Sequence, residues 1–317
     1  MRIAVFGTGA VGGYFGGRLA EAGEDVVFLA RGAHLKAMQE RGLRVSSIRG
    51  DFTVQPAHAV EQPSEAGPVD VVLLGVKAWQ VSDAARTMGP MLGRDTFVVP
   101  LQNGVEAPGQ LAEVLGRDRV LGGMCRVLST IKQPGHIDQD GVEPYVAFGE
   151  LEGSLTSRVE RLHQAFARAR GVTAEIPRDM VAAMWTKFMF ISAFGGVGAI
   201  TRSTAGVIRT RPETRRLLLQ ALEEARQVAL AHQVRLPDDV VDQVMLLIDD
   251  LPEQGTASMQ RDIAAGRPSE LSSQSGAVVR LGHAAGVPVP VHTLIYESLL
   301  PLEKRARAAL GREPVAS

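Results

Sequence analysis

A glycine-rich turn near the N-terminus constrains the fold of this chain more than any other feature of its sequence. Gly7, Gly9 and Gly12 have the spacing G-x-G-x-x-G and come directly after the apolar run Arg2–Phe6, which has the length of a β-strand. Apolar residues then recur with helical spacing as far as Leu19. A strand, a glycine turn and a helix in this order are typical of the first βαβ unit of an open parallel sheet.

The same turn predicts a binding site. Gly7 permits the tight turn, Gly9 allows a pyrophosphate to approach the backbone, and Gly12 allows close packing of helix and strand. The free N–H groups at the start of the helix, at Ala10 and Val11, are suited to bind phosphate oxygens. We therefore expect a dinucleotide site here, against the alternative of an ordinary strand-to-helix turn that uses glycine only for its backbone freedom.

The second apolar run indicates which dinucleotide is bound. An NAD site usually has an acidic residue about 20 residues beyond the glycines, where it holds the ribose 2′-hydroxyl. Here the run ends in Arg31, and Asp25 lies at its opposite end. Because an arginine at this position can pair with a 2′-phosphate, the sequence predicts NADP as the cofactor. The alternative is a solvated loop arginine.

The remaining pattern divides the chain into two parts. Up to residue 177, strand-length apolar runs alternate with helical patterns, and after Arg178 the pattern is helical throughout. The expected strands are Arg2–Phe6, 26–30, 69–76, 97–101, 122–130, Tyr145–Gly149 and 173–176, and the expected helices are 181–193, 212–232, 238–251, 256–265, 270–285 and 291–309. We predict an α/β fold, with a Rossmann-like doubly wound parallel sheet over residues 1–177 and an all-helical domain over residues 178–317.

Composition excludes several functional classes. Lys and Arg number 34 against 35 Asp and Glu, a balance that disfavours nucleic-acid binding. The single cysteine, Cys125, excludes a disulfide framework, and the seven scattered histidines predict no metal site. No apolar run approaches the roughly 18 residues of a membrane span. We expect a cytoplasmic protein whose partners are a small-molecule substrate and, as an open alternative to a monomer, a second copy of the chain.

A lysine stands in the middle of an apolar helical stripe. The residues three, four and seven positions from Lys187 are all apolar: Met180, Ala183, Met184, Phe190, Ile191 and Phe194. Burial of an ammonium group is costly and lowers the pKa of a lysine, which can then give a proton to a developing alkoxide. The alternative is a lysine whose stem is buried while its amine reaches water.

Polar residues elsewhere extend this candidate site. Ser258 and Asp262 lie one helical turn apart, and Glu270 follows eight residues later, where we expect the first turn of a helix. Lys77 and Asn103 each follow a predicted strand, and the carboxyl ends of strands face the ligand crevice of an open sheet. Each of these residues also has an ordinary structural explanation, as a helix-start acid, a turn residue or a solvated lysine.

Taken together, these residues resemble the ketopantoate reductase family (2-dehydropantoate 2-reductase). The matching segments follow the family's order over about residues 1–290: the Gly7–Gly12 turn, Arg31, residues 76–80, residues 102–104, residues 185–187, and Ser258 with Asp262 and Glu270. The resemblance implies NADP binding by the first domain and an active site in the cleft between the domains. By position, Lys187 resembles the general acid and Glu270 the acid that binds substrate and orients the lysine. Ser258 resembles a substrate ligand, and Asn103 a residue near nicotinamide and substrate.

The chain departs from the family's pattern at three places. Ile191, Gly195 and Gly255 stand where family members commonly carry asparagines. We therefore expect NADPH-dependent reduction of 2-dehydropantoate, or of a bulkier and more apolar 2-oxo acid admitted by a wider pocket, to the 2-hydroxy acid. Two alternatives remain: a non-catalytic NADP-binding sensor or partner protein, and an opine or β-hydroxyacid type of dehydrogenase.

Overall fold

The computed structural model describes residues 1–310, which form two compact units. Unit 1 comprises Met1–Gln102 and Glu106–Met180, and unit 2 comprises Asn103–Val105 together with the chain from Val181 onward. The C-terminal segment 311–317, predicted to be a frayed tail, lies outside the described residues.

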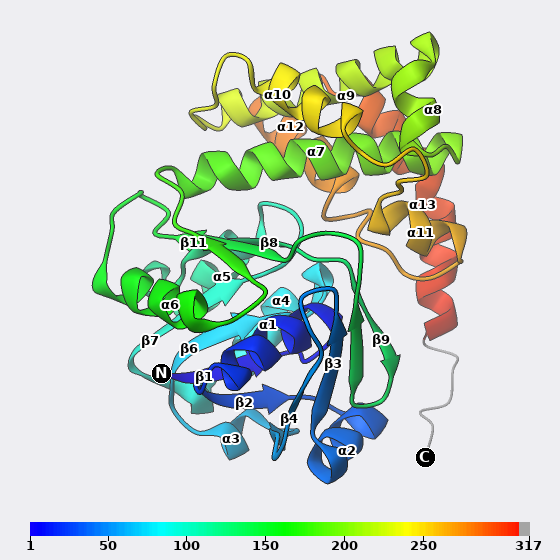
Figure 1. Cartoon of the computed structure of the whole chain (residues 1–317). Helices are drawn as coiled ribbons and strands as arrows, with labels where there is room; N and C mark the ends of the chain where they lie inside the picture. The colour runs from blue at the N-terminus through cyan, green and yellow to red at the C-terminus, as the bar shows by residue number, and fades with distance from the viewer. Residues whose placement is uncertain (311–317) are drawn as a thin grey trace. The chain divides into compact units, whose positions relative to one another are not determined.

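Unit 1 is built on a five-stranded parallel sheet with the strand order β5-β2-β1-β6-β7 (Figure 1). Its strands are β1 (Arg2–Phe6), β2 (Asp25–Leu29), β5 (His58–Val60), β6 (Val69–Leu74) and β7 (Leu92–Pro100). From the central β1 the chain moves first to β2 on one side and later to β6 on the other, and Ile3 pairs with Val26 and with Val71. The order reverses at β1, so the carboxyl ends of β1 and β6 flank the crevice in which such sheets bind ligands.

Helices cover both faces of this sheet because its strands are apolar on both sides. Ile3 and Val5 face a core that includes Phe15 of α1, whereas Ala4 faces a second core that includes Val81 of α4 and Leu111 of α5. The helices of unit 1 are α1 (Ala10–Glu21), α2 (Gly32–Arg41), α3 (Pro63–Ala66), α4 (Val81–Thr87), α5 (Ala107–Leu115) and α6 (Ser157–Arg168).

Two smaller sheets complete unit 1. A four-stranded sheet has the order β4-β3-β10-β9, and a three-stranded sheet has the order β12-β11-β8. Their strands are β3 (Leu43–Ser47), β4 (Phe52–Val54), β8 (Gly122–Arg126), β9 (Ser129–Gln133), β10 (His136–Gln139), β11 (Tyr145–Gly149) and β12 (Thr173–Glu175). The run 122–130, expected as one segment, is divided between β8 and β9, which belong to different sheets.

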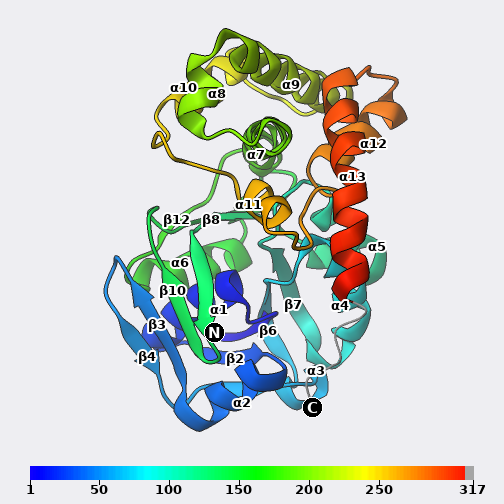
Figure 2. The same cartoon turned by 90° about the vertical axis from the view of Figure 1, so that its right-hand side faces the viewer.

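All regular elements described in unit 2 are helices (Figure 2). They are α7 (Met180–Thr201), α8 (Ala205–Thr210), α9 (Pro212–Ala231), α10 (Val240–Asp249), α11 (Ser258–Ala264), α12 (Ser275–Ala285) and α13 (Pro290–Leu310). One continuous core joins them, in which Phe188 of α7, Leu222 of α9 and Ile295 of α13 are all nearly inaccessible. The predicted fold class, a doubly wound parallel sheet followed by a helical domain, is confirmed.

Helix α7 contradicts the expectation that no apolar segment approaches the length of a membrane span. With 22 residues it is long and apolar enough to cross a bilayer by length and composition, so the statement that no run approaches that length is wrong. However, 61% of its most apolar stretch is buried inside the protein. A core helix is apolar all round for the same reason as a membrane span, because neither contacts much water.

Candidate functional site

The glycine turn of unit 1 has the geometry of a phosphate-binding loop. Gly7 has a φ of +93°, and a Cβ there would lie 2.7 Å from Cγ1 of Val76, so glycine is required. A Cβ at Gly12 would lie 2.4 Å from the Gly7 carbonyl oxygen, which confirms the close approach of helix and turn. By contrast, nothing lies within 4 Å of a Cβ at Gly9. The N-terminus of α1, which begins at Ala10, therefore has open space beside it, as an anion at a helix start requires.

Two cationic residues follow the neighbouring strands of unit 1. Arg31 comes two residues after β2, is exposed, and precedes the first residue of α2. Lys77 comes three residues after β6, and its Nζ lies 5.9 Å from the centre of the Trp79 ring. Both residues follow the carboxyl ends of strands that flank β1, which is where the sequence predicted them.

The glycine turn rests on a polar layer of buried groups. Thr8 is 5% exposed, and its hydroxyl donates a 2.9 Å hydrogen bond to the Leu29 carbonyl at the end of β2. His34 of α2 accepts a hydrogen bond from the Gly135 N–H at Nδ1. Burial lowers the pKa of His34 below 6.5, and a hydrogen bond with the backbone of Thr8 opposes this shift.

Unit 2 brings three of the predicted site residues into one hydrogen-bonded chain. The Lys187 ammonium on α7 donates to Oδ1 of Asn103 at 2.9 Å. The Nδ2 group of Asn103 in turn donates to Oε2 of Glu270 at 2.9 Å. Glu270 is 8% exposed, and Lys187 and Asn103 are half-buried. An ammonium and a carboxylate are therefore joined through a single amide, which fixes the position of each charged group.

Neighbouring contacts fix the loop that carries Asn103. Gly104 has a φ of +108°, and a Cβ there would lie 2.9 Å from the Ser273 carbonyl oxygen. Within unit 1, the preceding Gln102 is 6% exposed and donates from Nε2 to the carbonyls of Leu74 and Val76. The amide of Gln102 therefore anchors the strand end from which Asn103 departs, a role that the turn-like sequence Gln-Asn-Gly does not reveal.

Glu270 is held by a network that the sequence did not indicate. The preceding residue, Ser269, donates from its backbone N and from Oγ to the Glu303 carboxylate at 2.9 and 2.6 Å. Glu303 is 4% exposed and also pairs with Nε of Arg307 at 2.6 Å. The expectation that Glu270 stands in the first turn of a helix is wrong, because α12 begins five residues later at Ser275. Tertiary hydrogen bonds, not a helix start, place Glu270.

Ser258 and Asp262 lie one helical turn apart on α11, as predicted, but in the described part of the chain neither side chain joins the bonded chain of Lys187, Asn103 and Glu270. They are the first and fifth residues of α11, and Ser258 is exposed. Asp262 pairs with Arg267 at 2.8 Å, beyond the end of the helix. Neither side chain bonds to Lys187 or Glu270 among residues 1–310. Ser258 nevertheless lies between Ala257 and Met259, which both face Gly195 of α7.

The three departures from the family's pattern do not leave open space. A Cβ at Gly195 would meet Cβ of Ala257 and Cε of Met259 at 3.4 Å, which is ordinary packing distance. A Cβ at Gly255 would lie 2.9 Å from the Pro252 carbonyl oxygen, because Gly255 belongs to a tight turn. Ile191 is half-buried. The predicted gain of volume at these glycines is therefore wrong.

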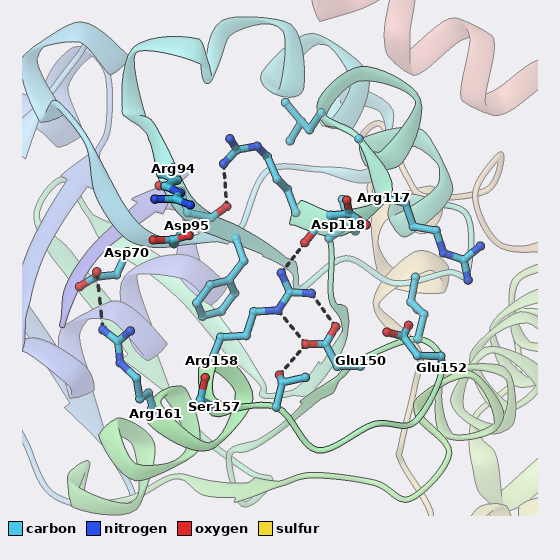
Figure 3. Close-up of a pocket in the computed structure, with 18 residues that line it drawn as sticks. Asp70, Arg94, Asp95, Arg117, Asp118, Glu150, Glu152, Ser157, Arg158 and Arg161 are labelled. Carbon is cyan, nitrogen blue, oxygen red and sulfur yellow. Dashed lines mark hydrogen bonds and ion pairs between the residues drawn. The ribbon is translucent and has the colours of Figure 1, made fainter.

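A separate polar pocket of about 950 Å³ lies at the opposite end of the sheet of unit 1 (Figure 3). It is lined by Asp70 near the start of β6, by Arg94 and Asp95 near the start of β7, and by Arg158 of α6. None of the predicted site residues lines it. Its arginines and acidic residues are equal in number, so its lining carries no net charge, and two ion pairs form within it, Arg158 with Glu150 at 2.6 Å and Arg161 with Asp70 at 3.6 Å.

Comparison with known proteins places these features in a family. The family model described as "Ketopantoate reductase PanE/ApbA" matches residues 3–153, and the model of its C-terminal part matches residues 179–303. A 2-dehydropantoate 2-reductase from Mesorhizobium japonicum is 31% identical, covering 98% of this chain and 99% of the relative. The crystal structure of a PanE/ApbA family ketopantoate reductase from Ralstonia eutropha is 32% identical with a TM-score of 0.87, covering 97% of this chain and all of that chain.

A more distant structure has the same fold. A D-mandelate dehydrogenase with NADH and anilino(oxo)acetate is 20% identical with a TM-score of 0.86, covering 97% of this chain and 99% of its own. At this identity the likeness concerns the fold alone. The two family models, by contrast, together span both units, and the relatives above 30% identity cover nearly the whole chain. The chain belongs to the ketopantoate reductase family of oxidoreductases.

Proposed function

We propose that this protein reduces a 2-oxo acid to the 2-hydroxy acid with NADPH, and that Lys187 acts as the general acid. The candidate substrates are 2-dehydropantoate, as in the named relatives, and a more apolar 2-oxo acid. The observation that carries the proposal is the chain of hydrogen bonds from Lys187 through Asn103 to Glu270, which holds an ammonium donor beside a carboxylate.

Residues of unit 1 fit a nicotinamide dinucleotide. The open space beside Gly9 and the free N–H groups at the start of α1, including those of Ala10 and Val11, suit the pyrophosphate. The exposed guanidinium of Arg31 suits a 2′-phosphate, and Lys77 adds positive charge next to the same strand ends. When bound, the reduced cofactor supplies the hydride to the carbonyl carbon.

The residues of unit 2 supply the proton, hold the ammonium that gives it, and offer a contact for the substrate carboxylate. Lys187 gives a proton from Nζ to the carbonyl oxygen as negative charge develops there. Asn103 and Glu270 hold that ammonium in one position before the reaction, so that little reorganisation accompanies it. The hydroxyl of Ser258, exposed at the start of α11, is the candidate anchor for the substrate carboxylate.

The proposal is tested by following NADPH oxidation with a panel of 2-oxo acids that includes 2-dehydropantoate and branched and aromatic analogues. We expect saturable turnover of at least one member, with a much lower rate for NADH. Tight NADPH binding without turnover of any panel member would support the sensor alternative and contradict the proposed activity.

A further inference from the structure

A second side-chain amide lies beside helix α7, two turns beyond Lys187. Gln274 is 2% exposed, and its Oε1 lies 3.5 Å from the position of a Cβ on Gly195. Among residues 1–310, the side-chain amide of Gln274 takes part in no hydrogen bond. The donor and the acceptor of this largely enclosed amide therefore remain available to a ligand.

Gln274 and Asn103 both donate a hydrogen bond to Glu270. The backbone N–H of Gln274 donates to the Glu270 carbonyl at 3.0 Å, while the Glu270 carboxylate accepts from Asn103. Asn103 thus bonds to α7 at Lys187, and the side-chain oxygen of Gln274 lies where a Cβ on Gly195 would meet it. Lys187, Ile191 and Gly195 recur every four residues and share one face of the helix. The two amides therefore stand at the two ends of the face on which Ile191 lies.

The absence of a side chain at Gly195 leaves room for the side chain of Gln274. A Cβ at position 195 would be in ordinary contact with Gln274, Ala257 and Met259, so atoms beyond Cβ would collide with these residues. An asparagine at 195 would therefore compete with Gln274 for the same space. The chain contains one asparagine, Asn103, whose amide is already committed to Lys187 and Glu270. A further amide contact to a substrate has to come from a glutamine.

We infer that Gln274 is a specificity-determining residue that binds a hydrogen-bonding group of the substrate, such as a hydroxyl, at the end remote from the reacting carbonyl. This inference rests on the proposed 2-oxo acid reductase activity and narrows its substrate class. A glutamine amide offers both a donor and an acceptor, so it pairs with a hydroxyl in either sense. A site with such a buried amide rejects a substrate that leaves the amide unpaired.

A matched pair of substrates tests the inference. 2-Dehydropantoate carries a terminal hydroxyl, and 3,3-dimethyl-2-oxopentanoate replaces that hydroxyl with a methyl group of similar size. We expect the native protein to favour the hydroxyl substrate by about tenfold or more in kcat/KM, the effect of one hydrogen bond and one amide left unpaired. Gln274→Met should bring this ratio close to one, chiefly through the hydroxyl substrate.

Controls separate a role in recognition from a role in folding. Gln274→Leu provides a second apolar side chain, and both variants should keep the native Kd for NADPH and the native Tm. Ser275→Ala is the matched control, because the Ser275 hydroxyl is buried without a hydrogen-bond partner among the described residues but lies 3.2 Å from the Cβ position of Gly196 and not of Gly195. Ser275→Ala should keep the native substrate ratio.

The outcomes distinguish this inference from the activity on which it rests. An unchanged substrate ratio in folded Gln274→Met or Gln274→Leu would overturn the role of Gln274 and leave the reductase activity in place. Native preference for the methyl analogue would also overturn it and would support the preference for an apolar substrate that the sequence suggested. Turnover of neither substrate, nor of any other 2-oxo acid, would overturn the proposed function and this inference with it.

Discussion

The ammonium group of Lys187 donates a 2.9 Å hydrogen bond to the side-chain oxygen of Asn103, which lies 84 residues earlier in the chain. Because the amide of Asn103 also donates to Glu270, each end of the amide is satisfied by a charged partner. The orientation of this one amide therefore sets the positions of both the candidate proton donor and the candidate carboxylate.

Removal of the bridging amide should impair turnover. We predict that Asn103→Ala lowers kcat by about 10- to 100-fold, the equivalent of the 1.5–3 kcal/mol of a hydrogen bond to a charged group. Steady-state kinetics with a productive 2-oxo acid measure the effect. Ser273→Ala, which removes a neighbouring hydroxyl bonded only to the Glu270 backbone carbonyl, is the control and should retain nearly native kcat. A native kcat for Asn103→Ala would exclude the bridge from catalysis.

Arg31 should determine the preference for NADPH over NADH. We predict that Arg31→Ala weakens NADPH binding by about ten- to hundredfold, because a charge-assisted contact with the 2′-phosphate is lost. NADH binding should change little, since NADH lacks that phosphate. Titrations of both cofactors measure the Kd values, with Arg41→Ala at the exposed end of α2 as the control. Equal losses for the two cofactors would show that Arg31 does not recognise the phosphate.

The Glu303 carboxylate should contribute to both stability and catalysis. Its removal in Glu303→Ala takes away the buried carboxylate that the Ser269 donors and the Arg307 guanidinium share. We predict a loss of about 3–5 kcal/mol in the free energy of unfolding by urea, as for other broken buried pairs. We also predict a lower kcat under conditions where the variant is folded, since Ser269 precedes Glu270. Exposed Glu297 on the same helix provides the control Glu297→Ala, and equal stability of the two variants would refute the prediction.

Acid should destabilise unit 1 through Glu150. Burial alone raises the pKa of this carboxyl, but hydrogen bonds from Arg158 and Thr156, with the charge of Arg158, outweigh burial and hold the pKa below 4.5 (Figure 3). A carboxyl whose pKa is lower in the folded state contributes stability above its unfolded pKa. That contribution is lost as the pH falls through the folded value.

The corresponding measurement is the free energy of unfolding against pH. We predict that the native protein loses stability below about pH 4.5, and that Glu150→Gln is less stable at neutral pH by about 1–3 kcal/mol but loses less on acidification. Glu152→Gln, an exposed neighbour, should follow the native curve. Parallel curves for native protein and Glu150→Gln would show that this pair does not carry the acid sensitivity.

Local sequence patterns predicted the elements whose signals are local. The strand Arg2–Phe6 and the strand Tyr145–Gly149 were predicted to the residue, and α9 to within one residue, because dense apolar runs and the Pro212 start signal act within a few positions. The strands β3, β4 and β10 were not predicted. They are short and partly exposed, and pairing partners as distant as residues 43–47 and 136–139 create them.

The candidate site also has features that local sequence predicts and features that depend on distant contacts. The apolar stripe around Lys187 and the glycine turn are readable from spacing, since helix and turn geometry follow from sequence neighbours. The position of Glu270 depends on the hydrogen bond from Ser269 to Glu303, which lies 34 positions later in the chain. No local sequence pattern predicts such a contact. The filling of the space at Gly195 by residues 257, 259 and 274 likewise arises only when three separate segments pack together.

The role of Lys187 as the general acid of an NADPH-dependent 2-oxo acid reductase can be tested by one comparison. The rate of NADPH oxidation at saturating 2-oxo acid is measured for the native protein and for Lys187→Ala, together with the Kd for NADPH of each. We predict that Lys187→Ala lowers kcat by about 10²- to 10⁴-fold and leaves the Kd nearly unchanged. A native kcat in Lys187→Ala would contradict it.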